Sequence, residues 1–384
     1  MANNNKHTGP NVPALRFPEF SGEWIESKLG DIADFSKGAG ISKDQRSEEG
    51  NPCILYGELY TRYKSEVITN VFSKTALPDS ELVKSKANDI IIPASGETAE
   101  DIATARCVPF DNILLGGDLN IIRLHEQDGK FFSYQLNGVR KYDIATVAQG
   151  VSVVHLHAGD LKGITVKYPS HIAEQEKISQ ILGLIDDRIA TQSKIIEEQE
   201  TLLKSLADKM FLQNNFSSQL SELVNIEKGK QLNADTLSET GDYYVMNGGI
   251  TPSGYYSEYN VPAGAISISE GGNSCGYVQF NEKPFWSGGH CYSLQCRTNL
   301  VDYKYIYYYL KTKEADVMAL RIGSGLPNIQ KKDIEKFTIS YPSLQLQKQF
   351  VKALDALSGK INTEKNLLEK YCQQKSYLLS QMFI

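Results

Sequence analysis

Two stretches of the sequence carry apolar residues at alternating steps of four and three. The first stretch ends at Met210 and the second at Met382, and neither contains proline. Such steps repeat every seven residues, so that one apolar stripe stays turned toward a partner helix, as in a coiled coil. We therefore predict two long helices, over 171–213 and 343–384, that pair as an antiparallel coiled coil. The predicted seam is formed by Ile178, Leu182, Ile185, Ile189, Ile196, Leu203, Leu206, Met210, Phe350, Leu354, Leu357, Ile361, Leu368, Leu378 and Met382.

Four polar residues interrupt this seam, namely Gln192, Gln199, Glu364 and Lys375. Polar residues at seam positions weaken an all-apolar core, but they fix the register between two partner helices. The interruptions therefore favour one defined pairing of the two helices.

The segment before each long helix has the pattern of short strands. Apolar runs such as DIIIP and NIIRL in the first half, and AISIS and YSLQC in the second, are bounded by Gly, Asn and Pro, as strands commonly are. The stretches 131–142 and 301–320 favour short helices instead. Each half of the chain is therefore predicted to contain an α+β domain.

The two halves are copies of one pattern. KLGDIADFSKG at 28–38 corresponds to QLSELVNIEKG at 219–229, and DLKGITVKYPS at 160–170 corresponds to DIEKFTISYPS at 333–343. The first copy has an insertion in the loop after Gly57. The match is strongest at element boundaries, and two copies that share a scaffold but differ in their loops can carry two binding specificities.

This organisation predicts an α+β fold with two pseudo-repeated α/β domains separated by two long helices. The predicted parts are a flexible N-terminus over 1–19, a first domain over 20–170, a first helix over 171–213, a second domain over 214–342 and a second helix over 343–384.

Composition changes this picture little. The 40 Lys and Arg against 46 Asp and Glu give a net charge of −6, which taken alone argues against nucleic-acid binding, although local patches and partner subunits can supply a basic surface. The first residues, MANNNKHTGPNVP, lack the pattern of an export signal, and no apolar run is long enough to span a bilayer. We expect a cytoplasmic protein that does not contact membranes.

Three sequence motifs together point to a known family. VPALRFPEFSGEW lies near the N-terminus, YPSHIAEQEKISQILGLIDDRI leads into the first long helix, and YPSLQLQKQF repeats the second motif in the other copy. With these motifs the chain resembles the specificity subunit of type I restriction-modification systems over almost its whole length. The second copy departs from the pattern where Glu174-Gln175 becomes Leu346-Gln347, with one residue fewer after the proline.

The resemblance implies that each globular domain is a target recognition domain that reads one half of a split sequence in double-stranded DNA. It also implies that the helices set the length of the unread spacer and bind two DNA methyltransferase subunits. These subunits would bind S-adenosylmethionine and flip the target adenine, and restriction endonuclease subunits could join the complex. The chain itself would have no catalytic centre and no cofactor.

The residues themselves show no motif for catalysis. The sequence lacks GxGxxG after a strand, GxxxxGK[ST], HExxH, GxSxG and the Asn/Asp-Pro-Pro-aromatic tetrapeptide that resembles an amino-methyltransferase site. Cys275, His290, Cys291 and Cys296 lie near one another in the sequence, but their spacing fits no zinc finger. We therefore predict no metal site.

Polar loops that differ between the copies are the predicted DNA-contacting parts. Amides and hydroxyls read base edges, whereas Lys and Arg hold phosphates; for any one residue a solvated loop position is the alternative. In the first copy the predicted residues are Lys37, Lys43, Arg46, Tyr60, Arg62, Tyr63, Lys64, Ser95 and Thr98. In the second copy they are Lys228, Lys230, Asn247, Tyr255, Tyr256 and Asn273.

Two other functions stay open at the level of sequence. One is a structural or adhesin-like coiled-coil protein whose domains bind protein or glycan without DNA specificity. The other is an enzyme with an unrecognised active site in the strand-rich domains. A gel shift on duplex DNA separates DNA recognition from the first, and a methylation assay on the chain alone separates it from the second.

Overall fold

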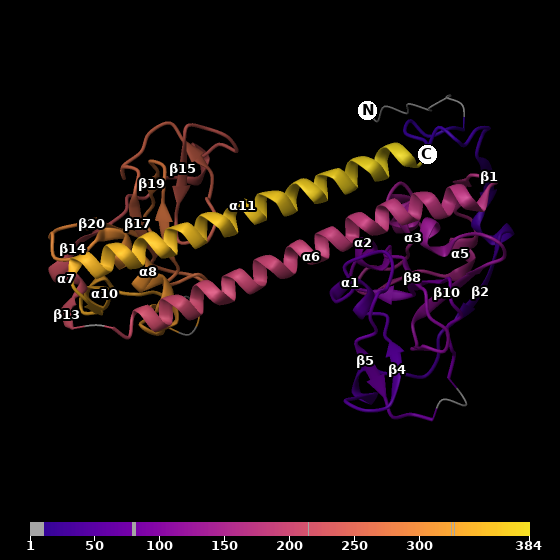
Figure 1. The fold of residues 1–384 in the computed structure, drawn as a ribbon, viewed down its shortest axis with the longest axis horizontal. Helices are drawn as coiled ribbons and strands as arrows, with labels where there is room; N and C mark the ends of the chain where they lie inside the picture. Colours follow the sequence, from indigo (N-terminus) through magenta and orange to yellow (C-terminus); the bar gives the residue numbers. More distant parts are fainter. Residues whose placement is uncertain (1–10, 79–81, 214, 324, 326) are drawn as a thin grey trace. The chain divides into compact units, whose positions relative to one another are not determined.

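The computed structural model describes residues 11–78, 82–213, 215–323, 325 and 327–384. The chain divides into two units (Figure 1). Unit 1 comprises the chain up to residue 193 together with 367–384, and unit 2 comprises 194–366. Each unit therefore contains one globular domain, a part of the first long helix and a part of the second.

The two predicted heptad helices are present as α6 (Ile172–Met210) and α11 (Leu344–Met382), with 39 residues each. In unit 1, Nζ of Lys375 in α11 lies 2.6 Å from Oδ1 of Asp186 in α6. In unit 2, Nζ of Lys365 lies 2.6 Å from Oε1 of Glu200. Late residues of α11 thus meet early residues of α6, and the helices run antiparallel.

All predicted seam residues are buried or half-buried, but they do not serve only the helix pair. Ile178, Leu182 and Met382 belong to the hydrophobic core of unit 1. Phe350 and Leu354 belong to the core of unit 2. The ends of the helices are therefore also walls of the globular domains, a role that the heptad pattern did not indicate.

The main sheet of unit 1 has four antiparallel strands in the order β2-β10-β6-β8. Their bounds are β2 (Ala33–Lys37), β10 (Leu119–Leu124), β6 (Asp89–Pro93) and β8 (Arg106–Val108). The apolar run DIIIP forms β6 because both of its faces are covered: Ile90 and Ile92 enter one core cluster, and Ile91 enters another. Successive side chains of a strand point to opposite faces, so this run serves two cores.

The main sheet of unit 2 has the same order, β14-β20-β17-β18. Its strands are β14 (Val224–Lys228), β20 (Cys291–Cys296), β17 (Ala265–Ser269) and β18 (Val278–Asn281). Each unit also has a two-stranded antiparallel sheet. It is formed by β1 (Ile25–Lys28) and β12 (Thr165–Tyr168) in unit 1, and by β13 (Phe216–Gln219) and β21 (Thr338–Tyr341) in unit 2. The duplication predicted from sequence is therefore a duplication of topology.

The repeat extends to single hydrogen bonds. The amide of Asp128, the N-cap of α3 (Gly129–Asn137), donates to Oε1 of Gln175 over 3.0 Å. The amide of Asp302, the N-cap of α8 (Tyr303–Thr312), donates to Oε1 of Gln347 over 2.7 Å. The motif glutamine before each long helix thus ties that helix to the helix that packs on the sheet.

A pair of glycines is also shared. A Cβ on Gly38 would lie 2.0 Å from the carbonyl oxygen of Gly116, and a Cβ on Gly229 would lie 2.2 Å from that of Gly288. Both distances are far shorter than any van der Waals contact. Glycine is required at the end of β2 and of β14 because the backbones approach closely there.

The units differ in a smaller sheet, which carries most of the variable loops. Unit 1 has the order β3-β5-β4-β9, and unit 2 has β16-β15-β19. These strands are β3 (Arg46–Ser47), β5 (Ser73–Thr75), β4 (Asn51–Ile54), β9 (Leu114–Leu115), β16 (Tyr255–Tyr256), β15 (Tyr243–Met246) and β19 (Trp286–Ser287). The insertion after Gly57 supplies helix α1 (Glu58–Thr61) and strand β5 of unit 1.

The remaining elements are short. In unit 1 they are η1 (Leu29–Asp31), η2 (Lys43–Gln45), β7 (Ser95–Gly96), α2 (Ala99–Ile102), α4 (Lys141–Thr146), β11 (Val154–His155) and α5 (Ala158–Lys162). In unit 2 they are α7 (Leu220–Leu223), η4 (Ala234–Thr236), α9 (Glu314–Ala319) and α10 (Lys331–Glu335). The two predicted short helices are each divided in two, at Gly138 and at Lys313, where the C-cap residue leaves the helical conformation.

The prediction of a flexible N-terminus over 1–19 lies partly outside the described residues, which begin at residue 11. From there the chain makes defined contacts. The amide of Leu15 donates to the carbonyl of Gln381 over 2.9 Å, and Nε of Arg16 lies 2.7 Å from Oε1 of Glu174. Among the described helices, none combines the length and apolar character that crossing a bilayer requires.

Candidate nucleic-acid interface

Three of the residues predicted to contact DNA line one open groove in unit 1. Lys43 in η2, Arg46 in β3 and Tyr60 in α1 surround a volume of about 740 Å³. We call this the loop groove. Gly57 and Gly117 also line it, so backbone is accessible there as well as side chains. Lys43 and Arg46 are exposed, and Tyr60 is half-buried.

A buried carboxylate organises the basic residues at this groove. Oε1 of Glu58 lies 3.5 Å from Nη1 of Arg62 and 3.9 Å from Nη1 of Arg46. The side chain of Glu58 is only 9% exposed, whereas those of Arg62 and Arg46 are 46% and 39% exposed. Arg62 also lies over the ring of Phe72, 4.5 Å from its centroid. The two guanidinium groups thus form ion pairs with one buried carboxylate, and both side chains remain exposed to solvent.

Two predicted contact residues of unit 1 are buried in the structure. Tyr63 is 4% exposed and packs in a core cluster with Ile54 and Leu59, and burial raises the pKa of its hydroxyl to about 12. Ser95 is 8% exposed because it pairs with His155 in the strand pair β7–β11. Neither side chain can reach a base edge without disrupting its surroundings.

The other predicted residues of unit 1 lie at the surface. Lys37 ends β2, Lys64 follows α1, and both are exposed. Thr98 is exposed as well, but its hydroxyl accepts from the amide of Asp101 over 3.1 Å and so caps helix α2. Thr98 therefore already has a structural role.

In unit 2, Lys228 forms an ion pair with a buried glutamate, Glu270, that the sequence analysis did not select. Oε1 of Glu270 lies 2.5 Å from Nζ of Lys228 and accepts from the hydroxyl of Tyr292 over 3.0 Å. Burial, together with the bond to Glu270, raises the pKa of Tyr292. Oε2 of Glu270 lies 3.3 Å from Nδ1 of His290, whose side chain is 62% exposed. Much of the Lys228 charge is therefore matched inside the domain.

The remaining predicted residues of unit 2 surround an aromatic pair. Nε1 of Trp286 donates to the carbonyl of Lys230 over 2.8 Å, and its ring meets that of Tyr256 edge-on with centroids 5.1 Å apart. Tyr255 precedes Tyr256 in β16 and is half-buried. Two further predicted residues lie apart from this pair. Asn247 is half-buried, and its Oδ1 accepts from the amide of His290 over 3.0 Å, whereas Asn273 is exposed.

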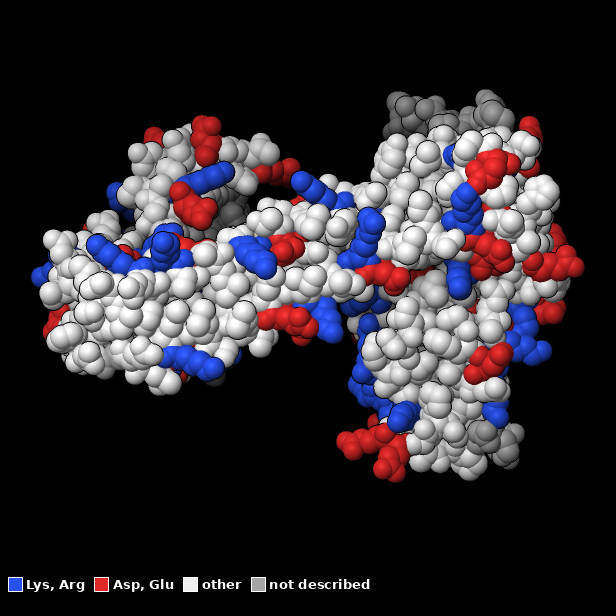
Figure 2. Space-filling view, viewed as in Figure 1, with Lys and Arg blue, Asp and Glu red and all other residues white. Residues whose placement is uncertain are grey.

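Charge on the visible face of the molecule is mixed. Figure 2 shows Lys and Arg interspersed with Asp and Glu over most of that face. Within unit 1, basic side chains gather along the edge where α1 and β5 lie (Figures 1 and 2). The exposed basic residues of this segment are Arg62, Lys64 and Lys74. A local basic edge thus exists in a chain whose net charge is negative.

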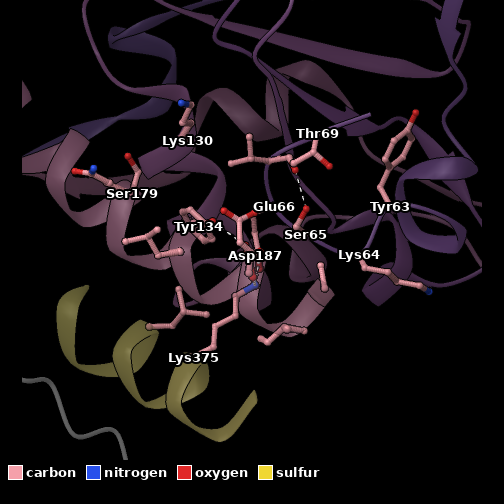
Figure 3. Close-up of a pocket in the computed structure, with 18 of the residues that line it drawn as sticks. Tyr63, Lys64, Ser65, Glu66, Thr69, Lys130, Tyr134, Ser179, Asp187 and Lys375 are labelled. Atoms are coloured by element: carbon pink, nitrogen blue, oxygen red, sulfur yellow. Dashed lines mark hydrogen bonds and ion pairs between the residues drawn. The ribbon is translucent and has the colours of Figure 1, made fainter. Parts of the chain in front are cut away.

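A second concave site, the helix cleft, lies in unit 1 between the segment 62–72 and the helices α3, α6 and α11 (Figure 3). Its volume is about 1160 Å³. Lys375 extends from α11 toward Glu66 and Tyr134 in the close-up. The cleft therefore joins the insertion of the first copy to the two long helices.

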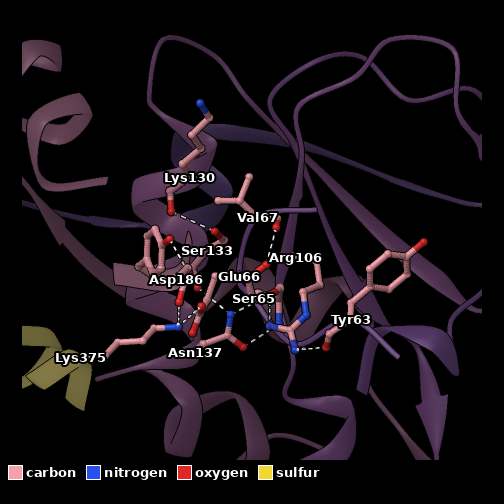
Figure 4. Close-up of polar contacts among 12 residues, drawn as sticks. Tyr63, Ser65, Glu66, Val67, Arg106, Lys130, Ser133, Asn137, Asp186 and Lys375 are labelled. Carbon is pink, nitrogen blue, oxygen red and sulfur yellow. Dashed lines mark hydrogen bonds and ion pairs between the residues drawn. The ribbon is translucent and has the colours of Figure 1, made fainter. Parts of the chain in front are cut away.

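A buried ionic network closes one wall of this cleft (Figure 4). Nζ of Lys375 lies 2.5 Å from Oε2 of Glu66 and 2.6 Å from Oδ1 of Asp186. The hydroxyl of Tyr134 donates to Oδ2 of Asp186 over 2.7 Å. Burial acts to lower the pKa of Lys375, but Glu66 and Asp186 outweigh it and raise that pKa. Burial raises the pKa of Glu66, and the nearby carboxylate of Asp186 raises it further, which outweighs the opposite effect of Lys375.

Arg106 extends the network toward the loop groove. Its guanidinium donates to the carbonyls of Leu59 over 3.2 Å and of Tyr63 over 3.0 Å. Arg106 is 8% exposed, and burial lowers its pKa, which Glu66 and Asp186 partly offset. The backbone between the predicted contact residues is thus held by a charged side chain from β8.

Within the described part of the chain, no group of three or more His, Cys, Asp or Glu side chains is arranged to hold a metal ion. Of the cysteines weighed as zinc ligands, Cys275 and Cys291 are buried and Cys296 is exposed. Burial raises the pKa of Cys291 to about 11, so that its thiol retains the proton at neutral pH.

Comparison with known proteins gives one family for both halves of the chain. The family model described as "Type I restriction modification DNA specificity domain" matches residues 21–201 and 214–370. A type I specificity subunit of Mycoplasma genitalium is 26% identical over 281 residues, which are 69% of this chain and 73% of that protein. A type I specificity subunit of Mycoplasma pneumoniae is 34% identical over 152 residues, 39% of this chain and 40% of that protein.

Solved structures share the fold. The crystal structure of the type I restriction-modification S subunit from M. genitalium aligns over 97% of this chain and 99% of that chain, with a TM-score of 0.71 and 22% identity. A chain from a study of complex assembly and conformational transition in the type I restriction-modification system aligns over 94% of this chain and 97% of that chain, with a TM-score of 0.54 and 15% identity.

Proposed function

This chain belongs to the family of type I restriction-modification DNA specificity proteins, and we propose that each of its two globular domains reads one half of a bipartite DNA sequence. One observation carries the proposal above all. The two units share one main-sheet topology, β2-β10-β6-β8 and β14-β20-β17-β18, yet differ in the smaller sheet and its loops. A common scaffold with two different loop surfaces suits a protein that presents two specificities to one duplex.

We propose the loop groove and the basic edge beside it as the contact surface of unit 1. Lys43, Arg46, Tyr60, Arg62 and Lys64 remain in this set, together with Lys37 and Thr98 at its margins. Guanidinium groups held by Glu58 are ordered before binding, so less side-chain entropy is lost on contact with a guanine edge or a phosphate. In unit 2 the proposed contacts are Lys230, Asn247, Tyr255, Tyr256 and Asn273, with Lys228 as a phosphate contact tuned by Glu270.

We further propose that α6 and α11 set the length of the unread spacer and bind two DNA methyltransferase subunits. Restriction endonuclease subunits join this complex as a further step. S-adenosylmethionine and the flipped adenine are bound by the methyltransferase subunits, and this chain contributes no catalytic group. The complex acts in the cytoplasm, where its DNA substrate lies. A coiled-coil adhesin is the less favoured function, because the family match covers both domains.

Selection from random duplex DNA tests the binding proposal. The purified complex of this chain with its copurifying methyltransferase is expected to enrich a sequence with two specified blocks and an unspecified block between them. Controls show that the complex is intact and that the salt concentration stays in the millimolar range. If no sequence is enriched under these conditions, the result contradicts DNA specificity. The catalytic proposal has its own test: the chain alone, given labelled S-adenosylmethionine and the enriched duplex, is expected to transfer no methyl group.

A further inference from the structure

Unit 1 packs the end of α11 and unit 2 packs the end of α6. The side chains that contact these two helix ends differ in chemistry. In the heptad pattern, Lys375 of α11 takes the place that Leu203 takes in α6, because both lie seven residues before Met382 and Met210 respectively. Lys375 packs in unit 1, and Leu203 packs in unit 2. Equivalent positions of two equally long helices therefore carry a cation and an apolar residue.

Unit 1 provides a charged site for Lys375. Glu66 comes from the insertion of the first copy, Asp186 from α6 and Tyr134 from α3, and Arg106 of β8 lies beside Glu66 (Figure 4). The side chains of Lys375, Glu66 and Asp186 are 14%, 11% and 10% exposed. We call Glu66, Asp186 and Lys375 the charge lock. Solvent is largely excluded from it, and Lys375 is the cation that pairs directly with both carboxylates, while Arg106 lies near Glu66.

In unit 2 the hydroxyl of Tyr308 donates to Oδ1 of Asp355 over 2.7 Å, and the site is otherwise mainly apolar around Leu203. This residue packs against the core cluster that contains Phe211, Tyr305 and Tyr308. In the repeat, Ser358 of α11 stands where α6 has Asp186, and the second copy lacks the insertion that supplies Glu66. Neither carboxylate of the charge lock therefore has a counterpart at the equivalent positions of unit 2.

We infer that the charge lock determines which helix unit 1 accepts: it selects α11 of the same chain and rejects α6 of a second copy. Because both helices have 39 residues and the same heptad pattern, the repeat alone would also allow two copies to pair, with unit 1 against unit 1 and unit 2 against unit 2. That pairing would place Leu203 against Glu66 and Asp186 and remove the ammonium group with which both buried carboxylates pair, leaving only the nearby Arg106 as a cation. It would also place Lys375 against the apolar site of unit 2.

Both mismatches are costly for the same physical reason. An ion taken out of water without its partner loses its hydration and gains no compensating attraction, and breaking a buried pair costs far more than the intact pair contributes. The charge lock therefore contributes partner choice more than stability. The inference concerns assembly of the chain and does not depend on which ligand the domains bind.

Exchanging the two residues in the full-length chain tests this inference. In the variant L203K/K375L the lysine is in α6 and the leucine is in α11. The lysine can then reach the charge lock, and the leucine the apolar site of unit 2, only when each helix packs against the domain of a second copy. Wild-type chain is expected at the mass of one chain, 42.8 kDa, by light scattering at micromolar concentration, and the exchange variant at twice that mass. An exchange variant that remains a single copy, with an unfolding temperature within about 2 °C of wild type, overturns the inference.

A second series covers the case in which the exchange variant does not fold. K375L alone is expected to lower the unfolding temperature by roughly 5–15 °C, since it removes the ammonium group that pairs with both buried carboxylates. E66Q/D186N/K375L is expected to recover most of that loss, because it also removes the carboxylate charges. The matched control is K365L, which removes an ion pair whose side chains are 52% and 49% exposed and is expected to change the temperature by less than about 2 °C. Wild-type stability of K375L, or no recovery in the triple variant, overturns the inference.

Discussion

At the residue scale, buried carboxylates decide what the exposed basic residues can do. Glu58 pairs with Arg46 at the loop groove and with Arg62 beside it, and Glu270 pairs with Lys228 in unit 2. In both units a carboxylate that is less than a tenth exposed fixes a side chain that is much more exposed. The bond between Lys228 and Glu270 is a charge-assisted hydrogen bond, whereas Glu58 attracts its two arginines as ion pairs at 3.5 and 3.9 Å.

Arg62 provides the most direct test of this idea. The variant R62Q is expected to weaken binding of the complex to its target by about 1–3 kcal/mol, because the proposed contact of Arg62 with a guanine edge would be lost. The effect should be confined to the half-site read by unit 1. Equilibrium binding to duplexes that vary in one half-site at a time measures it.

The matched control for R62Q is K194Q, which removes the same charge from an exposed position on α6 where Lys194 is 77% exposed. Its effect on binding should be small and equal for both half-sites. Equal losses in R62Q and K194Q would show that Arg62 contributes only general electrostatic attraction.

The charge lock gives a prediction for pH. The pKa of Lys375 is raised above its ordinary 10.5 by Glu66 and Asp186, so its stabilisation is fully present below that pH and is lost as the pH rises through the folded-state value. The difference in free energy of unfolding between wild type and K375M should therefore be large at pH 8 and shrink above pH 10.5. Urea unfolding at several pH values measures it, and a difference that stays constant up to pH 11.5 would contradict the assignment.

At the element scale, the sequence predicted those elements whose pattern is local. The steps of four and three predicted α6 and α11, and the apolar run over 89–93 predicted the strand β6, because burial imposes a period that is visible along the chain. The breaks at Gly138 and Lys313 were missed, since both lie inside stretches that remain amphipathic on either side.

The organising acids could not be predicted from local pattern. Glu66 and Lys375 are 309 residues apart in sequence, and an isolated glutamate in a variable loop is ordinarily a solvated residue. Lys375 gave one signal, as a charged residue at a seam position. Tyr63 and Ser95 were selected as contact residues because they lie between exposed polar residues, and only the fold shows that they are buried.

The shared glycines lead to a prediction for the elements they join. G38A and G229A should each destabilise the chain by about 1–3 kcal/mol, because the new Cβ would overlap a carbonyl oxygen and force the backbones apart. G359A is the control, since a Cβ at Gly359 in α11 would meet nothing within 4 Å; alanine should there stabilise the helix by up to about 1 kcal/mol. Chemical denaturation measures all three, and a neutral G38A would show that the close approach is relaxed in solution.

At the scale of the whole molecule, duplication followed by divergence of the loops explains why one chain can carry two specificities. The main sheets, the N-caps of α3 and α8 and the motif glutamines Gln175 and Gln347 are preserved between the copies. The smaller sheets share a parallel pair, β4 with β9 and β15 with β19, but differ in the strands added to it. The charge lock then makes the copies unequal as partners, so that a repeat protein prefers its own second half.

The proposal that the two helices set the length of the DNA spacer can be tested by lengthening both helices. Three heptads inserted after Gln199 and after Tyr371 add about 32 Å, which matches about nine base pairs and nearly one turn of the duplex. We expect the complex to bind a target whose spacer is longer by about nine. One heptad in each helix adds about 10 Å, or about three base pairs, and turns the second domain away from its groove, so binding should fail at any spacer. An unchanged spacer in the three-heptad variant would show that these helices do not set it.

The most direct test of the central claim is the pattern of methylated adenines in DNA from cells that express this chain with its methyltransferase, compared with cells that express the methyltransferase alone. If the two domains each read half of one target, single-molecule sequencing will find methylation that depends on the chain, in one motif with two specified blocks and a spacer of fixed length. A single continuous motif, or no methylation that depends on the chain, would contradict bipartite recognition.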